Sequence, residues 1–248
     1  MQRSSRQKAP IWLLVVALLS SAEFPSLLLA GTNAWGIDYS NPGKYLVSGE
    51  QTTLTREDWE AISPELPFAP IGLPELGKLY AWKRTWFKSV SGGGKFVGKS
   101  TAQDLIRKRT LTGCHDHGLI LVAVLRRLGV PAVFVDATGI QWTLEYPERT
   151  RSFRGHVFVE AYLQNAWILL DSVSGEFIPN YDPSNPVIPI GKPNDEKGFC
   201  VLFKGIDPAD YGVARIEELN RAQAGFARKM RLEVPNFRYP PYVIQRLP

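Results

Sequence analysis

The segment from Cys114 to Leu128 constrains the fold more than any other part of the chain. Every residue from Leu119 to Leu125 is apolar, so a helix over these positions has no polar face and must be surrounded by other elements. Gly129 and Pro131 then end the helix, because glycine suits the position after a helix and proline cannot continue it. The sequence therefore predicts a helix that is buried on all sides.

Segments with strand character follow this helix. Residues 132–136 predict a first strand, and residues 199–203 predict a late one. Between them, residues 155–163 and 166–173 are rich in β-branched, aromatic and leucine side chains and are joined at Gln164-Asn165. A two-residue connection of this kind predicts an antiparallel hairpin. A buried helix followed by strands in a meander indicates an α+β fold.

Pro74 marks the start of a further helix, because proline is favoured in the first helical turn. Apolar residues then recur near helical spacing as far as the glycines 92–94, which are expected to end this helix. Basic residues lie between the apolar ones: Lys78, Lys83, Arg84 and Lys88. The pattern predicts an amphipathic helix with one apolar and one basic face.

Two other segments have helical signals. A short helix is expected from Ser100 or Thr101 to about Arg109, with Gln103 or Asp104 suited to a capping box. Asp207-Pro208 is expected to open a last amphipathic helix. The proline-rich stretch 178–198 predicts a long loop.

Residues 1–22 have the pattern of an export signal. An apolar run from Ile11 to Leu19 precedes the small residues Ser20, Ser21 and Ala22, and three basic residues come before it: Arg3, Arg6 and Lys8. We expect cleavage after Ala22, and an uncleaved anchor reaching about residue 30 is the alternative. The expected location is therefore the periplasm, the cell envelope or the extracellular space, with membrane contact only through this segment.

The rest of the chain divides into three parts. An irregular, proline-containing segment spans 31–75, a core spans 76–205, and a helix with an extended tail spans 206–248. The net charge of +5 does not indicate a nucleic-acid partner, because outside the signal 26 basic residues face 24 acidic ones. A nucleic-acid-binding face would need clustered basic residues.

Cys114 is the first candidate for chemistry. It opens the buried helix, where unpaired amides and the helix dipole favour a thiolate, which is the nucleophilic form of cysteine. A thiolate nucleophile needs a base and a group that orients the base. Among the three histidines, His115 and His117 are too close in sequence to reach over the helix end, whereas His156 begins a predicted strand.

The hairpin arithmetic supplies the orienting group. With a turn at Gln164-Asn165, Asp171 lies opposite Phe158, on the same face as His156 and diagonal to it. Asp171 can then hold the His156 ring. Glu160 shares this face, and we expect it to be a hydrogen-bonded strand residue rather than a catalytic one.

These residues resemble a known family. The stretch TGCHDHGLILVAVLRRLGVPA is similar to the nucleophile helix of the transglutaminase-like superfamily, and GHVFVEAYL followed by AWILLDSV is similar to its histidine and aspartate strands. The resemblance implies a papain-like core in which Cys114 is the nucleophile, His156 the base and acid, and Asp171 the orienting group. Two departures are Gly113, one place rather than two before the cysteine, and Ser172 in place of a common proline.

The resemblance implies a thiol enzyme, either a cysteine peptidase or amidase or an acyltransferase, that acts on peptide or protein amide bonds without a cofactor. We favour hydrolysis over cross-linking, because no amine-binding site or calcium loop is visible in the sequence. A non-catalytic envelope protein with a degenerate site remains the alternative.

Three other hypotheses compete for the same residues. A disulfide between Cys114 and Cys200 would remove the nucleophile. Zinc bound by Cys114, His117, His156 and Cys200 would need a spacing that matches no common finger. Gly93 to Ser100 fits the phosphate-loop pattern, but a charged helical stretch precedes it instead of a buried strand.

Overall fold

The computed structural model describes residues 35–67, 69–93, 96–150, 152–193 and 196–248. The expected signal segment 1–22 and the alternative anchor to about residue 30 lie outside these ranges. Among the described residues, no helix is both long and apolar enough to cross a membrane.

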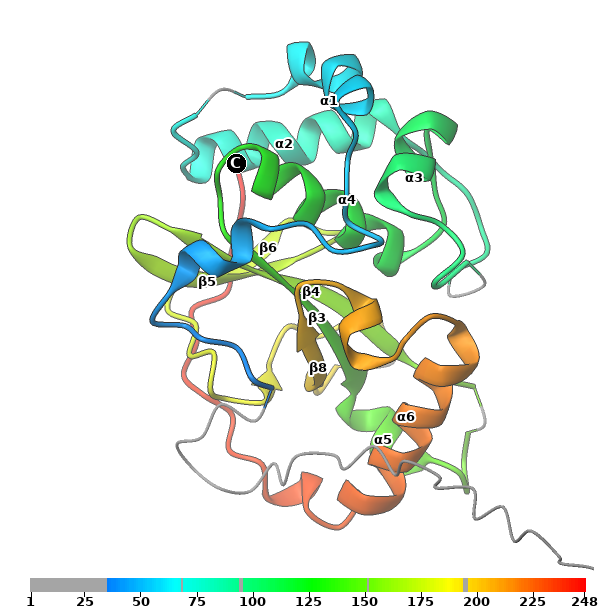
Figure 1. Cartoon of the computed structure of the whole chain (residues 1–248). Helices are drawn as coiled ribbons and strands as arrows, with labels where there is room; N and C mark the ends of the chain where they lie inside the picture. The colour runs from blue at the N-terminus through cyan, green and yellow to red at the C-terminus, as the bar shows by residue number, and fades with distance from the viewer. Residues whose placement is uncertain (1–34, 68, 94–95, 151, 194–195) are drawn as a thin grey trace, which may run out of the picture.

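A curled antiparallel sheet forms the centre of the molecule (Figure 1). The described residues contribute seven strands in the order β7-β8-β3-β4-β5-β6-β9. In chain order these strands are β3 (Ala132–Gly139), β4 (Gly155–Leu163), β5 (Ala166–Asp171), β6 (Glu176–Ile178), β7 (Val187–Ile188), β8 (Phe199–Gly205) and β9 (Gln245–Arg246). The predicted hairpin is β4-β5, and the strand expected at 132–136 continues to Gly139.

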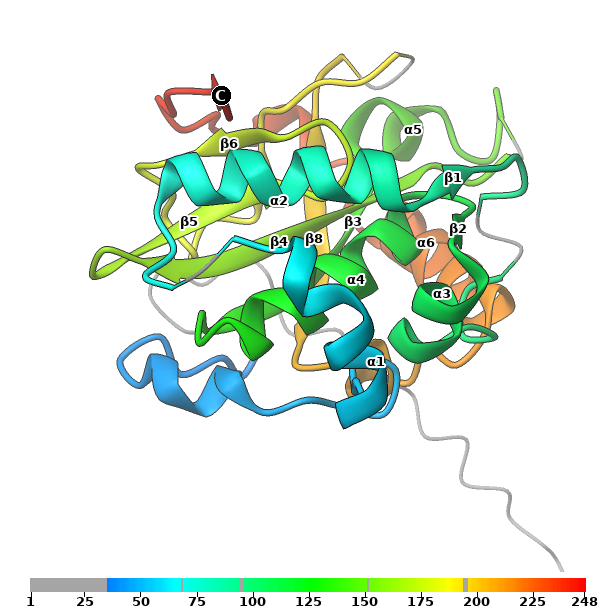
Figure 2. The same cartoon turned by 90° about the horizontal axis from the view of Figure 1, so that it is seen from above.

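Helices cover the sheet. They are α1 (Arg56–Ile62), α2 (Leu73–Trp86), α3 (Ala102–Lys108), α4 (Cys114–Arg127), α5 (Ile140–Glu145) and α6 (Ile216–Met230). Figures 1 and 2 show α1 to α4 gathered on one side of the sheet, with α5 and α6 together at its far end. The expected fold class is confirmed: the fold is α+β, with a buried helix packed on an antiparallel sheet.

Helix α4 lies directly against β3 and β4. Its apolar residues join Phe134 and Val157 in the largest hydrophobic cluster. The approach is so close at Gly118 that a Cβ atom there would lie 2.4 Å from Val157 Cγ1 and 2.8 Å from Phe134 Cε2. The all-round apolar pattern and this glycine together place the N-terminal end of α4 beside the start of β4.

Helix α2 differs from its sequence prediction in length and in burial. It ends at Trp86 rather than at glycines 92–94, because the chain becomes extended and the strand β1 (Lys88–Ser89) pairs in parallel with β2 (Thr110–Leu111). Lys83, which the helical pattern put between the apolar positions, is only 2% exposed. The basic face of this helix is therefore interrupted by a buried lysine.

The C-terminal helix also begins later than expected. Asp207 caps only a single 3-10 turn, Pro208–Tyr211, which ends at Gly212 with a φ of 76°. The Asp207 carboxylate also accepts hydrogen bonds from the backbone amides of Gln51 and Thr52, at 2.7 and 3.0 Å. Helix α6 then starts at Ile216, and the tail beyond it ends in β9, which pairs with β6.

Candidate active site

Cys114 is the first residue of α4, and its side chain is half-buried. The turn before it is fixed by Asp116, whose Oδ2 accepts hydrogen bonds from the Thr112 backbone amide at 2.8 Å and from the Thr112 hydroxyl at 2.7 Å. The thiol is therefore held at a helix N-terminus, where backbone amide groups are unpaired. Sequence reasoning placed Cys114 correctly at the helix start but missed Asp116.

The hairpin register brings His156 to Asp171. Phe158 lies opposite Asp171 and Leu163 opposite Ala166, as the arithmetic on the turn predicted. Gln164 and Asn165 have φ values of 49° and 64°, which a two-residue hairpin turn of the primed type requires. His156 Nε2 is 3.0 Å from Asp171 Oδ2.

His156 and Cys114 line the same cavity, and the Cys114 side chain is close enough to act on the pKa of His156, so the three residues lie together as a three-residue cluster. Burial by itself lowers the pKa of His156, but its interactions with Asp171 and Cys114 outweigh burial and raise it to about 9. The imidazole is thus protonated at neutral pH, next to a thiol at a helix N-terminus. A protonated imidazole beside a thiol is in position to give its proton to a leaving group.

Asp171 is held by four groups at once. Its Oδ1 accepts hydrogen bonds from the backbone amides of Val173 and Ser174, both at 2.8 Å. Its Oδ2 contacts His156 and also Lys192 Nζ, at 2.5 Å. Burial raises the pKa of Asp171, but its bonds to His156 and Lys192 hold that pKa well below the usual range. The carboxylate is therefore charged and cannot rotate away from His156.

Helix α2 supports the turn that follows Asp171. The Tyr80 hydroxyl donates to the Asp171 carbonyl at 2.6 Å, and Lys83 Nζ donates to the Ser172 carbonyl. This contact explains why Lys83 is buried, and burial lowers its pKa to about 7. The sequence carries no signal that separates Lys83 from its exposed neighbours on the helix, because the partner lies 89 positions away.

Ser172 links the two halves of the site. Its hydroxyl lies 2.7 Å from the Val157 carbonyl and 3.2 Å from the Cys114 carbonyl, in position to donate to either. A proline at this position would have no hydroxyl for this link. The serine that departs from the common family pattern therefore ties the end of β5 to the start of α4.

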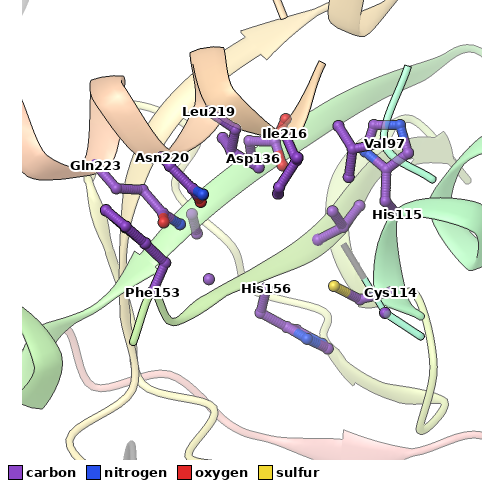
Figure 3. Close-up of a pocket in the computed structure, with 14 residues that line it drawn as sticks. Val97, Cys114, His115, Asp136, Phe153, His156, Ile216, Leu219, Asn220 and Gln223 are labelled. Atoms are coloured by element: carbon purple, nitrogen blue, oxygen red, sulfur yellow. The ribbon is translucent and has the colours of Figure 1, made fainter. Parts of the chain in front are cut away.

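A cavity of about 470 Å³ opens beside Cys114 and His156 (Figure 3). Its other walls come from β3, β4 and α6 and from the segments just before α3 and β4. The lining residues beyond the two proposed catalytic ones are Gly93, Val97, His115, Asp136, Ala137, Phe153, Gly155, Val157, Ile216, Leu219, Asn220 and Gln223. Of the described residues between α5 and β4, only Phe153 lines the cavity.

The other two histidines stay apart from the three-residue cluster. His115 is buried against Phe134, with ring centroids 5.4 Å apart, and burial lowers its pKa to about 4. His117 has a pKa lowered to about 3 by burial and by the nearby Lys83. Within the described ranges, neither ring nitrogen of His115 has a hydrogen-bond partner, and Nδ1 of His117 has none either.

The disulfide and zinc hypotheses do not fit this arrangement. Cys114 and Cys200 are both free thiols. Cys200 lies on β8, buried in a cluster with Phe226 and Val187, and burial raises its pKa. No group of three metal-binding side chains is present among the residues that the structure describes.

The phosphate-loop pattern at 93–100 falls on turns. Its described residues follow β1, a two-residue exposed strand, rather than a buried one, and α3 begins only at Ala102. Gly94 and Lys95 lie outside the described residues. A phosphate loop would also need a magnesium-binding aspartate at the end of a strand, but Asp171 holds His156 and Asp136 accepts a hydrogen bond from the Tyr211 hydroxyl at 2.6 Å.

Comparison with known proteins finds a family-model match for part of the chain. A solved structure described as a "Putative Cysteine Protease from Cytophaga hutchinsonii" is similar, with 19% sequence identity and a TM-score of 0.47. The match covers 72% of this chain and 51% of the other, so the chain spans about half the length of that protein. No curated protein matches the sequence. Residues 75–172 match the family model of the transglutaminase-like superfamily, a range that includes Cys114, His156 and Asp171.

Proposed function

We propose, from the match of residues 75–172 to the transglutaminase-like family model, that the protein is a thiol enzyme that cleaves or transfers acyl groups at peptide or protein amide bonds. The observation that carries the proposal is the three-residue cluster of Cys114, His156 and Asp171 at the edge of a cavity. A nucleophile, a base and an orienting carboxylate are the parts that covalent acyl transfer requires.

In the proposed reaction, the Cys114 thiolate attacks the carbonyl carbon of the amide and a C–S bond forms. The His156 imidazolium gives its proton to the amide nitrogen, the C–N bond breaks and the amine leaves. Water then attacks the thioester while His156 takes a proton from it, and the acid and the thiolate are released. The backbone amide of Cys114 is the proposed donor to the oxyanion.

Hydrolysis is the proposed outcome rather than cross-linking, because water needs no binding site of its own. Asp171 would keep the imidazole oriented through both steps. It is fixed by Val173, Ser174 and Lys192, so its carboxylate needs no reorganisation when the imidazole changes charge.

We also propose that the protein is exported and acts outside the cytoplasm, on the pattern of residues 1–22. Because both cysteines are free thiols, neither of them needs an oxidising compartment to form a disulfide. The four-part division of the chain stays a prediction.

The test is acyl-enzyme formation with p-nitrophenyl acetate, an activated ester that reports attack at a carbonyl without a known natural substrate. We expect a burst of p-nitrophenolate equal to the enzyme concentration and an acetyl group on the peptide that carries Cys114. Cys114→Ser should abolish the burst, and the matched variant Cys200→Ser should retain it because Cys200 is buried. No burst, or acetylation at Cys200 alone, would contradict the proposal.

A further inference from the structure

The cavity beside Cys114 contains a buried acid that the proposed reaction does not use. Asp136, on β3, is 3% exposed and lines the cavity wall. One of its carboxylate oxygens, Oδ2, accepts the hydrogen bond from the Tyr211 hydroxyl at 2.6 Å. In the described part of the chain the other oxygen has no hydrogen bond and the carboxylate has no ion pair. A buried carboxylate is normally paired with a cation, and among the described residues Asp136 has only the Tyr211 hydroxyl as a partner.

Among the described residues, the side chains around Asp136 do not supply a cation. None of the described lining residues is a lysine or arginine. Of the two lining histidines, His115 is neutral because burial lowers its pKa to about 4, and His156 is already held by Asp171. Burial raises the pKa of Asp136 to about 6, which is the response of a carboxyl group without a positive neighbour.

The remaining walls suit a short chain that ends in a polar donor. Val97, Ile216 and Leu219 provide apolar contact, and the amide groups of Asn220 and Gln223 add hydrogen-bond acceptors on the α6 side (Figure 3). An aliphatic chain can lie along apolar side chains while its charged end reaches a polar group. This is the arrangement that an aminoalkyl side chain requires.

We propose that this cavity is a substrate subsite for a primary ammonium group on a short aliphatic chain, with Asp136 as its counter-ion and Asn220 and Gln223 as flanking hydrogen-bond acceptors. The subsite rests on the proposed function and deepens it, because it assigns a cationic residue of the acyl substrate, and not an attacking amine, next to the amide that Cys114 attacks. Three arginines precede β4 and would suit an acidic substrate, but Arg149 and Arg154 are not among the lining residues and Arg151 lies outside the described ones.

The experiment measures Cys114 modification by three methanethiosulfonates that differ in charge: the aminoethyl reagent is cationic, the methyl reagent neutral and the sulfonatoethyl reagent anionic. Each forms a mixed disulfide with the thiolate and releases methanesulfinate, so no catalytic turnover is needed. We expect the aminoethyl reagent to react fastest relative to the methyl reagent. Asp136→Asn should lower this ratio about tenfold, since a partly buried charge pair at contact is worth at least ~1.4 kcal/mol.

A second variant tests the same charge effect in case Asp136→Asn does not fold. Asn220→Asp adds a carboxylate at a half-exposed position of the lining, and we expect it to raise the same ratio severalfold. Glu217→Gln is the matched control, because it removes one acid from the exposed side of the same helix and should leave the ratio unchanged. Equal ratios in the wild type, Asp136→Asn and Asn220→Asp would overturn the subsite.

The two proposals can fail separately. A missing ester burst with a strong charge preference would remove the acyl-transfer proposal and keep the cationic subsite. A normal burst with no charge preference would keep the acyl-transfer proposal and remove the subsite.

Discussion

The β4-β5 hairpin carries buried charges at both ends of one face, and the two ends are built differently. At the β4 start, His156 and Asp171 meet beside a cavity. Toward the turn, Glu160 pairs with Lys204 at 2.5 Å, and both side chains are 0% exposed. Strand β4 therefore contributes one residue to a charge pair beside a cavity and one residue to a charge pair that is closed to solvent.

The closed end is saturated with partners. The Tyr39 hydroxyl donates to the second Glu160 oxygen at 2.8 Å. Lys204 also donates to the Pro183 carbonyl at 2.7 Å and lies 3.2 Å from the Tyr181 hydroxyl. No oxygen of Glu160 is left for a ligand, which agrees with the expectation of a hydrogen-bonded strand residue.

The open end leaves polar atoms unused. Among the described residues, one oxygen of Asp136 and both ring nitrogens of His115 have no hydrogen-bond partner, and both residues line the cavity. The difference teaches that a buried charge on this sheet is not by itself a sign of function. A functional end is marked by a cavity and by polar groups that the fold does not satisfy.

The largest expected effect is at the open end, on the rate of the ester reaction. His156→Ala should slow acyl-enzyme formation by about 10²–10⁴-fold, the usual worth of a positioned acid and base. The measurement is the burst rate with p-nitrophenyl acetate. His117→Ala serves as the histidine control, since His117 lies near the site but outside the three-residue cluster. A larger loss in His117→Ala than in His156→Ala would break the assignment.

At the closed end the expected effect is on stability. Lys204→Met leaves Glu160 buried without its cation and should lower the free energy of unfolding by about 3–5 kcal/mol. Urea unfolding followed by tryptophan fluorescence gives this value. The double variant Glu160→Gln/Lys204→Met should recover much of the loss, because it buries no unpaired charge. Equal stability of the single variant and the wild type would show that the pair is not closed to water.

The smallest effect is the pH dependence of stability from the open end. The pKa of His156 is about 9 in the folded protein, against about 6.5 for an unperturbed histidine. Between these pH values the folded state binds more protons, so this contribution is full below about pH 6.5 and is lost as the pH rises through about 9.

Unfolding free energies of the wild type and His156→Gln across this pH range would isolate the contribution as a difference. The difference is needed because Lys83, with a pKa lowered to about 7, acts in the opposite direction in both proteins. A difference that stays constant from pH 6 to 10 would contradict the proposed pairing of His156.

Much of the open end was predictable from local patterns. The apolar run after Cys114 allows only a buried helix, and the two-residue turn at Gln164-Asn165 sets the register that brings Asp171 toward His156. Helical and strand periods are local properties, because each depends only on residues within a few positions. The helix start, the hairpin and the three proposed catalytic positions follow from them.

The supporting groups depend on contacts between distant segments. Lys83 and Lys192 look like surface lysines in the sequence, yet one is bonded to the Ser172 carbonyl and the other to Asp171. Asp136 ends a predicted strand, and only the packing of α6 and the turn of Tyr211 over it make it part of a cavity wall. The sequence thus specified the elements and the proposed nucleophile, base and orienting acid, whereas tertiary packing decided which charges are paired, which are buried and which one is left for a ligand. The physical reason is that desolvation and pairing depend on every group that surrounds a charge, whatever its position along the chain.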